Sequence, residues 1–109
     1  MKIENTKFED AKVITPKVFK DSRGYFFESY KATTYSEKFS PCNFVQDNEV
    51  RSKKNVLRGL HYQLKRPQGK LVRVVCGKIM DVAVDIRIGS PTFGKFHIVE
   101  LSADNKKIF

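Results

Sequence analysis

The sequence contains no tryptophan, only two cysteines and no long apolar run. No stretch approaches the roughly 20 apolar residues that a membrane-spanning helix needs. The polar N-terminus, residues 1–10, lacks the apolar segment of a signal peptide. Cys42 and Cys76 match no zinc-binding spacing and are interpreted as separate thiols rather than a disulfide, as is usual in cytoplasmic proteins. We therefore expect a cytoplasmic protein with no membrane partner.

Helical periodicity is also scarce. It is confined to residues 33–39, where Thr33 or Thr34 could cap a short helix. The chain has 109 residues, of which 40% are hydrophobic, and the nine phenylalanines supply much apolar area to bury. A chain of this length can bury one modest core, and it shows no repeat or linker. A single domain spanning residues 1–109 is predicted.

Charge is unbalanced: 21 basic against 12 acidic residues give a formal net charge of +9. Such a balance raises the possibility of a nucleic-acid partner. The basic residues are scattered along the chain, however, and no zinc finger, basic zipper or RNP-type motif is present. We therefore expect no nucleic-acid partner, and a basic surface that favours anionic small molecules instead.

Most of the chain consists of short β-type segments between turn signals. Pro16 indicates an edge or a bend in the first of them, turns are expected at 21–24 and 102–105, and a loop is expected at 65–69. Many short strands at close spacing predict an all-β fold, a jelly roll or barrel. The chain stops on Ile108 and Phe109, at the start of a strand, so we expect an incomplete C-terminal side. The expected strands are 11–19, 25–30, 43–48, 56–63, 70–75, 78–87, 93–101 and 106–109.

The segments 70–75 and 78–87 suggest a hairpin, with Gly77 at its turn. A two-residue turn would place Lys70 opposite Asp85 and on the same face as Asp81. That charged face is either a solvated surface with cross-strand ion pairs or a polar interior that binds a charged ligand. The other face of segment 78–87 is expected to be the core face, because the residues at its alternate positions are apolar; they are Met80, Val82, Val84 and Ile86.

His61 lies in the string Val-Leu-Arg-Gly-Leu-His-Tyr-Gln, residues 56–63. Unperturbed histidine titrates near pH 6.5 and can accept a proton at neutral pH, although a lone strand histidine is more often structural. Strict alternation puts Arg58 on the opposite face, and a bulge at Gly59 could unite the two. His97 is interpreted as structural. No metal site is expected, because no second histidine follows His61 two residues on.

Several strings together resemble one known family. Phe-Lys-Asp-Ser-Arg-Gly-Tyr-Phe-Phe-Glu occupies 19–28, Phe-Val-Gln-Asp-Asn occupies 44–48, and the histidine string occupies 56–63. Residues 69–74 continuing to 81–87 make a fourth match, and 90–94 a weaker fifth. In this order they resemble the dTDP-4-dehydrorhamnose 3,5-epimerase family, a branch of the cupins.

The resemblance implies a cupin-type jelly roll or β-sandwich, usually a homodimer. Its members act without metal or cofactor on a dTDP-linked 4-keto-6-deoxyhexose. It implies that His61 abstracts the protons at C3 and C5, and that Lys70 stabilises the developing enolate. Phe26 would stack on the base or belong to the core. The remaining implied substrate contacts are Arg58 on the diphosphate, Gln46 and Asn48 on one strand face, and Arg23 and Glu28 reaching into the partner subunit's site.

Family members also carry, in a later part, a tyrosine acid and a carboxylate that orients the histidine, and neither can be located here. We therefore expect little or no epimerase activity from these 109 residues alone. Two alternatives stay open. One is a dimerising or nucleotide-sugar-binding module without catalysis, and the other is a related mono-epimerase or ketoisomerase.

Overall fold

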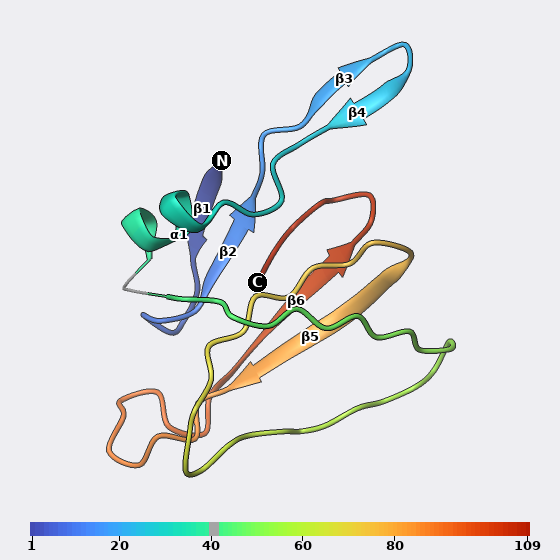
Figure 1. Ribbon diagram of the computed structural model, residues 1–109. Helices are drawn as coiled ribbons and strands as arrows, with labels where there is room; N and C mark the ends of the chain where they lie inside the picture. Colours follow the sequence, from blue (N-terminus) through green and yellow to red (C-terminus); the bar gives the residue numbers. More distant parts are fainter. Residues whose placement is uncertain (40–41) are drawn as a thin grey trace. The chain divides into compact units, whose positions relative to one another are not determined.

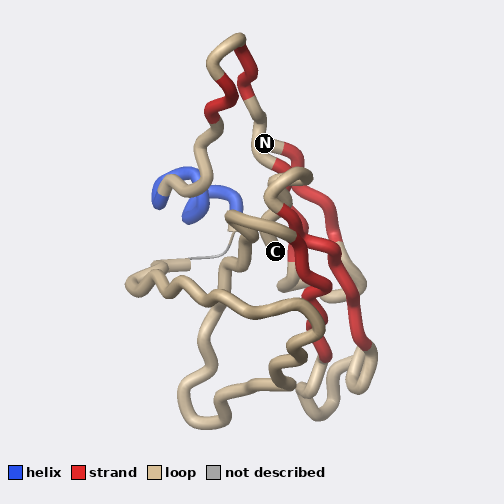
Figure 2. The backbone as a smooth tube through the Cα atoms, turned by 90° about the vertical axis from the view of Figure 1, so that its right-hand side faces the viewer, coloured by secondary structure: helices blue, strands red, loops and turns tan. Residues whose placement is uncertain are grey.

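The computed structural model describes residues 1–39 and 42–109. They form two compact units, Met1–Ser29 with Lys70–Phe109 (the first unit) and Tyr30–Gly69 (the second unit). The expected single domain stays a prediction. The elements in chain order are β1 Lys2–Asn5, β2 Lys12–Thr15, β3 Phe19–Asp21, β4 Gly24–Phe26, α1 Ala32–Lys38, β5 Lys78–Val84 and β6 Phe96–Ser102 (Figure 1; Figure 2).

The first unit is a β-sandwich. In one layer β1 pairs with β2, and Ile14 of β2 exchanges two backbone hydrogen bonds with Ile108, at 2.8 and 2.9 Å. The neighbouring Phe109 exchanges two more with Val72, so the chain end and the segment around residue 72 extend this layer. The other layer is the antiparallel pair β5–β6. Between them lies the core, made of Val13, Val99 and Leu101 with Val72, Val74 and Phe109. The predicted all-β class is confirmed.

Strand β6 determines which face of β5 is buried. Its residues Val99 and Leu101 are 6% and 0% exposed, and they lie opposite Asp81 and Ile79. Directly opposed residues share a face, so Ile79, Asp81 and Ala83 face the core. The predicted core face of β5 is therefore wrong, because apolar side chains occur at both parities and the partner strand decides between them. Three of the four residues predicted to face the core are exposed to solvent; they are Met80, Val82 and Ile86.

The predicted hairpin between 70–75 and 78–87 is also wrong. Strand β5 pairs with β6 over seven residue pairs, and the Gly77 carbonyl accepts a hydrogen bond from Ala103 N–H. Lys70 is therefore not opposite Asp85. The reason lies in Val72: its N–H and C=O already bond Phe109, at 2.7 and 2.9 Å, so they are not available to β5.

Asp85, expected on a charged face, is a buried anchor for the loop between β5 and β6, and its side chain is 1% exposed. It accepts hydrogen bonds from Arg87 Nε and Nη2, both at 2.9 Å, and from the hydroxyls of Ser90 and Thr92, both at 2.6 Å. Arg87 also donates to Asp10 at 2.7 Å. These donors, Arg87 foremost, hold the pKa of Asp85 well below its usual range.

The strands β3 and β4 form a two-stranded arm (Figure 1). The expected turn at 21–24 is confirmed: Asp21 Oδ1 accepts a hydrogen bond from Arg23 N–H at 2.8 Å, and Gly24 takes a φ of 141°. The strand expected over 11–19 is interrupted before Pro16, because β2 ends at Thr15. The strand expected over 25–30 is observed only as far as Phe26.

In the second unit, α1 starts and ends within one residue of the predicted helix. The predicted threonine cap is wrong, because the N-cap residue is Lys31 and no side chain caps the helix. Tyr35 is buried, with its ring 5.0 Å from that of Tyr30 and 5.4 Å from that of Phe39. At seven residues, this helix is far too short to cross a bilayer, and the rest of the described chain offers no other candidate.

The strands predicted at 43–48 and 56–63 are wrong as secondary structure. In the described part of both segments no residue belongs to a strand. Nearby, Val56 N–H bonds Lys53 C=O at 3.4 Å, which is a turn contact. A strand is defined by a hydrogen-bonded neighbour, and no β-ladder partner is present for these segments among the described residues. Their β-type sequence pattern is therefore not sufficient to make them strands.

Candidate functional site

His61 and Arg58 belong to an exposed, irregular segment of the second unit. Arg58 Nε donates a hydrogen bond to Ser52 Oγ at 2.9 Å. Gly59, between them, has a φ of 99°, a conformation that glycine adopts readily. The proposed strand bulge is wrong, because residues 56–63 are not a strand. The imidazole and the guanidinium are instead presented by a loop and are accessible to a ligand.

Gln46 and Asn48 lie in the same unit and are also exposed. Gln46 Nε2 donates a hydrogen bond to Asn48 Oδ1 at 3.0 Å, which holds the two amides side by side. The expected strand face is wrong, because residues 43–48 are not a strand, but the hydrogen bond still brings the two amides together. An amide pair offers both donors and acceptors, which suits the hydroxyl and carbonyl groups of a sugar or a base.

Arg23 occupies the tip of the β3–β4 arm of the first unit. Its Nη2 contacts Asp21 Oδ2 at 2.7 Å, and its side chain is otherwise open to solvent, at 89% exposure. This ion pair lowers the pKa of Asp21. Phe26 is 70% exposed, so its interpretation as a core residue is wrong, while base stacking stays a prediction. Glu28 follows β4 and is exposed.

Lys70 begins the segment of the first unit that leads to Val72, and it is exposed. Asp81 shares that unit and lies half-buried on the core-facing side of β5, where burial raises its pKa. A carboxyl with a raised pKa inside a sandwich is a candidate proton-carrying group. Sequence reasoning placed Asp81 only within a charged face. The β5–β6 register sets Asp81 opposite the buried Val99, and this pairing is what identifies Asp81 as a carboxyl that faces the core.

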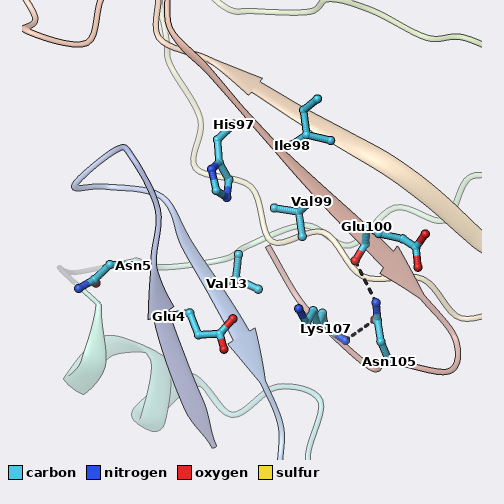
Figure 3. Close-up of a pocket in the computed structure, with 9 residues that line it drawn as sticks. All are labelled: Glu4, Asn5, Val13, His97, Ile98, Val99, Glu100, Asn105 and Lys107. Atoms are coloured by element: carbon cyan, nitrogen blue, oxygen red, sulfur yellow. Dashed lines mark hydrogen bonds between the residues drawn. The ribbon is translucent and has the colours of Figure 1, made fainter.

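A pocket of about 390 Å³ lies in the first unit beside β6 (Figure 3). Its polar residues serve the fold: Asn105 Nδ2 donates to the Glu100 carbonyl, and Asn105 Oδ1 accepts from Lys107 N–H, both at 2.9 Å. Glu4, whose pKa is lowered by Lys2, also lines it. None of the eight predicted site residues does. His97 is half-buried there, its ring 6.1 Å from that of Phe109, which supports the structural interpretation.

The sandwich and the exposed guanidinium, imidazole and amide groups define an all-β protein suited to polar, anionic ligands. Comparison with known families is specific: the profile described as dTDP-4-dehydrorhamnose 3,5-epimerase matches residues 5–109. The chain belongs to this family, and its fold is the cupin-type β-sandwich.

Individual relatives and solved structures belong to the same family. The dTDP-4-dehydrorhamnose 3,5-epimerases of Pseudomonas aeruginosa and Salmonella typhimurium are 51% and 53% identical, over 98% of this chain and 60% of theirs. The crystal structure of dTDP-6-deoxy-D-glucose-3,5-epimerase from Legionella pneumophila, in complex with dTDP-4-keto-L-rhamnose, is 53% identical with a TM-score of 0.94. It is covered to 57%, and this chain to 98%. The chain thus spans about 60% of the length of the curated relatives it matches.

A more distant structure is a 3'-monoepimerase from Streptomyces bikiniensis in complex with dTDP-quinovose. It is 34% identical, with a TM-score of 0.82 over 94% of this chain and 53% of that one. The same backbone therefore occurs in proteins whose described reactions differ in the number of centres inverted.

Proposed function

We propose that this chain serves the epimerisation at C3 and C5 of a dTDP-linked 4-keto-6-deoxyhexose, in deoxysugar biosynthesis of the dTDP-rhamnose type. The observation that carries this is the match to the Legionella epimerase, at 53% identity and a TM-score of 0.94, in a complex with dTDP-4-keto-L-rhamnose. Free thiols at Cys42 and Cys76 support a cytoplasmic setting.

The proposed base is His61. A C–H bond next to a ketone is acidified because the electron pair that is left behind delocalises onto the carbonyl oxygen. The free nitrogen of a neutral imidazole can take that proton, and the exposed ring of His61 is accessible to a bound sugar. Return of a proton to the opposite face of the carbon inverts the centre. The 4-keto group itself accepts the electron pair, so this chemistry needs neither a metal nor a cofactor.

Lys70 is proposed to stabilise the enolate oxygen. An ammonium group near the atom on which negative charge develops lowers the barrier more than it stabilises the neutral ketone. Its exposed position, at the start of the segment that enters the sandwich at Val72, leaves the ammonium able to reach a bound sugar. This role requires a fixed positive charge and no proton transfer.

Substrate contacts are proposed for the remaining residues. Arg58 suits the diphosphate, because its planar guanidinium matches phosphate oxygens. The amide pair Gln46–Asn48 suits the hydroxyl and carbonyl groups of the sugar nucleotide, and the exposed ring of Phe26 suits stacking on the base.

We further propose a homodimer in which Arg23 and Glu28 reach the site of the partner subunit. The β3–β4 arm supports this, because a two-stranded hairpin with exposed aromatic residues is marginal in stability until something covers it. Arg23 at its tip would contribute a cation to an anionic ligand.

Two measurements separate the candidate functions. Calorimetric binding of dTDP, lost in Arg58→Ala, is expected for both the epimerase and a non-catalytic binding module. Deuterium entering the sugar from heavy water, followed by proton NMR, is expected only for the epimerase. Exchange at C3 alone would indicate a 3'-monoepimerase, the candidate that the Streptomyces relative favours. Absence of dTDP binding would contradict the proposal.

A further inference from the structure

The β3–β4 arm continues from the end of β2 as a sheet of its own (Figure 1). In the described part of the chain β3 and β4 pair only with each other, so no β-ladder fixes the direction of the arm. Side chains must do so instead. Beyond the two segments that connect it, the arm and the adjoining Phe27 are reached in the described chain by hydrogen bonds and ring contacts of one residue, Lys106.

Lys106 contacts the arm with its ammonium group. Its Nζ donates a hydrogen bond to the hydroxyl of Tyr25 at 2.8 Å and lies 4.0 Å from the centre of the same ring. The ring of Phe27, stacked 6.1 Å from that of Tyr25, lies 5.9 Å from the same ammonium. A cation at such distances is attracted by the negative faces of aromatic rings. One ammonium thus binds two aromatic side chains at the base of the arm.

The backbone of Lys106 is unusual for a lysine. Its φ is 56°, in the left-handed region that glycine and asparagine adopt most readily. Asn105 Oδ1 accepts hydrogen bonds from the N–H groups of Ser102 and Lys107, at 3.1 and 2.9 Å, and so forms the turn without the side chain of Lys106. A residue in such a conformation indicates that its side chain has a role elsewhere. Here the contact with Tyr25 is that role.

The opposite side of the arm carries the candidate base-stacking ring. Successive residues of a strand point to opposite faces, so Phe26 faces away from the side on which Tyr25 contacts Lys106. Phe26 is 70% exposed, and the register sets it opposite Phe19, which is 53% exposed. Directly opposed residues share a face, so these two rings form an aromatic face that is open to a ligand. The ammonium of Lys17 lies 4.9 Å from the centre of the Phe19 ring.

We propose that Lys106 is a positioning residue: it holds the Tyr25 side of the arm and thereby directs Phe26 toward the base of a bound thymidine nucleotide. The proposal rests on the proposed function, in which Phe26 stacks on the base, and it names the group that fixes this ring. A two-stranded hairpin alone is marginally stable in water, so its direction needs support. A ring held in advance binds with less loss of conformational entropy than one on a mobile hairpin.

Calorimetry with two ligands separates this role from a general one. Lys106→Met removes the ammonium and is expected to weaken dTDP binding about fivefold, a part of the roughly five- to hundredfold that stacking of one base contributes. Binding of inorganic pyrophosphate, which has no base, is expected to stay unchanged. Lys106→Arg keeps the cation and should bind dTDP like the wild-type chain. Lys107→Met, which removes the same charge from the next residue, should do so too.

The Phe26→Ala background tests whether Lys106 acts through this ring. In that background Lys106→Met should cause no further loss of dTDP affinity, because the group that it positions is absent. A further loss there would overturn the proposal. Equal losses for dTDP and pyrophosphate, or wild-type binding of dTDP by Lys106→Met, would overturn it as well.

Nitrogen-15 relaxation examines the arm without any ligand. Residues 19–26 are expected to be more mobile on the picosecond-to-nanosecond timescale in Lys106→Met than in the wild-type chain or in Lys107→Met. The same spectra show whether each variant is folded. An arm equally mobile in all three chains would overturn the proposal. If the wild-type chain binds no dTDP but Lys106→Met still mobilises the arm, Lys106 holds the arm as proposed and the proposed substrate is wrong.

Discussion

Arg58 donates its Nε–H to the hydroxyl of Ser52, six residues earlier, at 2.9 Å. This contact uses Nε–H, the guanidinium donor nearest the main chain. It fixes the plane of the guanidinium and directs the two terminal nitrogens, with four further donors, away from Ser52. An arginine held in this way can bind a diphosphate through its two terminal nitrogens, and it loses less side-chain conformational entropy on binding than an unrestrained arginine.

Replacing Ser52 by alanine should therefore weaken binding of dTDP. A single hydrogen bond contributes about 1 kcal/mol, which corresponds to a roughly fivefold higher dissociation constant. Ser52→Thr, which keeps the hydroxyl, should bind like the wild-type chain. Isothermal calorimetry measures both, and thymidine, which has no phosphate, should show no difference. An equal loss for thymidine would mean that Ser52 acts on the fold and not on Arg58.

Arg58→Ala should be more severe, because charge-assisted hydrogen bonds to phosphate contribute about 1.5–3 kcal/mol. The expected loss of dTDP affinity is therefore tenfold to a hundredfold, in round terms (~1.4 kcal/mol per tenfold). Arg58→Lys should recover only part of it, since an ammonium lacks the planar fork. Arg66→Ala in the same unit is the matched control. Comparable losses at both positions would point to a general effect of positive charge.

Asp85 should make the stability of the chain depend on pH. Its native pKa lies well below the unfolded value of about 3.9, so on acidification the unfolded state takes up a proton first. The stabilisation is therefore present above about pH 3.9 and declines below it. Thermal unfolding between neutral and acidic pH should show a shallower decline for Asp85→Asn than for the wild-type chain. Asp104→Asn, at an exposed turn, should follow the wild type.

Asp81, on strand β5, should act in the opposite direction. Burial raises its native pKa above the unfolded value, so the native state favours the protonated form. Its contribution is full below about pH 3.9 and is lost as the pH rises through the raised value. Asp81→Asn should therefore raise the melting temperature at pH 7, with a difference that shrinks on acidification. A lower melting temperature at pH 7 would show that the carboxylate has a stabilising partner.

Features set by local sequence were predictable, and those set by distant pairing were not. The helix near residue 33, the end of β2 before Pro16 and the turn at 21–24 follow from short-range steric and hydrogen-bonding preferences. The partner of β5 depends on Val72 being already bonded to Phe109, which no local pattern reveals. Which side of β5 is buried could not be predicted for the same reason, because the face with Asp81 is buried against β6 although the opposite face is the more apolar one.

The candidate site shows the same division. The residue types in the string around His61 indicated proton transfer and anion binding, and the family is confirmed. Their presentation on a loop was not predicted, since alternating apolar residues favour a strand unless the neighbouring strand is missing. The contact between Arg58 and Ser52 requires the chain to fold back over six residues, which residue spacing in an extended segment cannot show.

The role of His61 is tested most directly by deuterium incorporation into a dTDP-linked 4-keto-6-deoxyhexose in heavy water, with the Legionella relative as the positive control. Wild-type chain should introduce deuterium at C3 and C5 only at a small fraction of that enzyme's rate, in keeping with the low activity expected of these 109 residues alone. His61→Asn should abolish the exchange while dTDP binding remains. Exchange that persists in His61→Asn at the wild-type rate would contradict the assignment of this imidazole as the base.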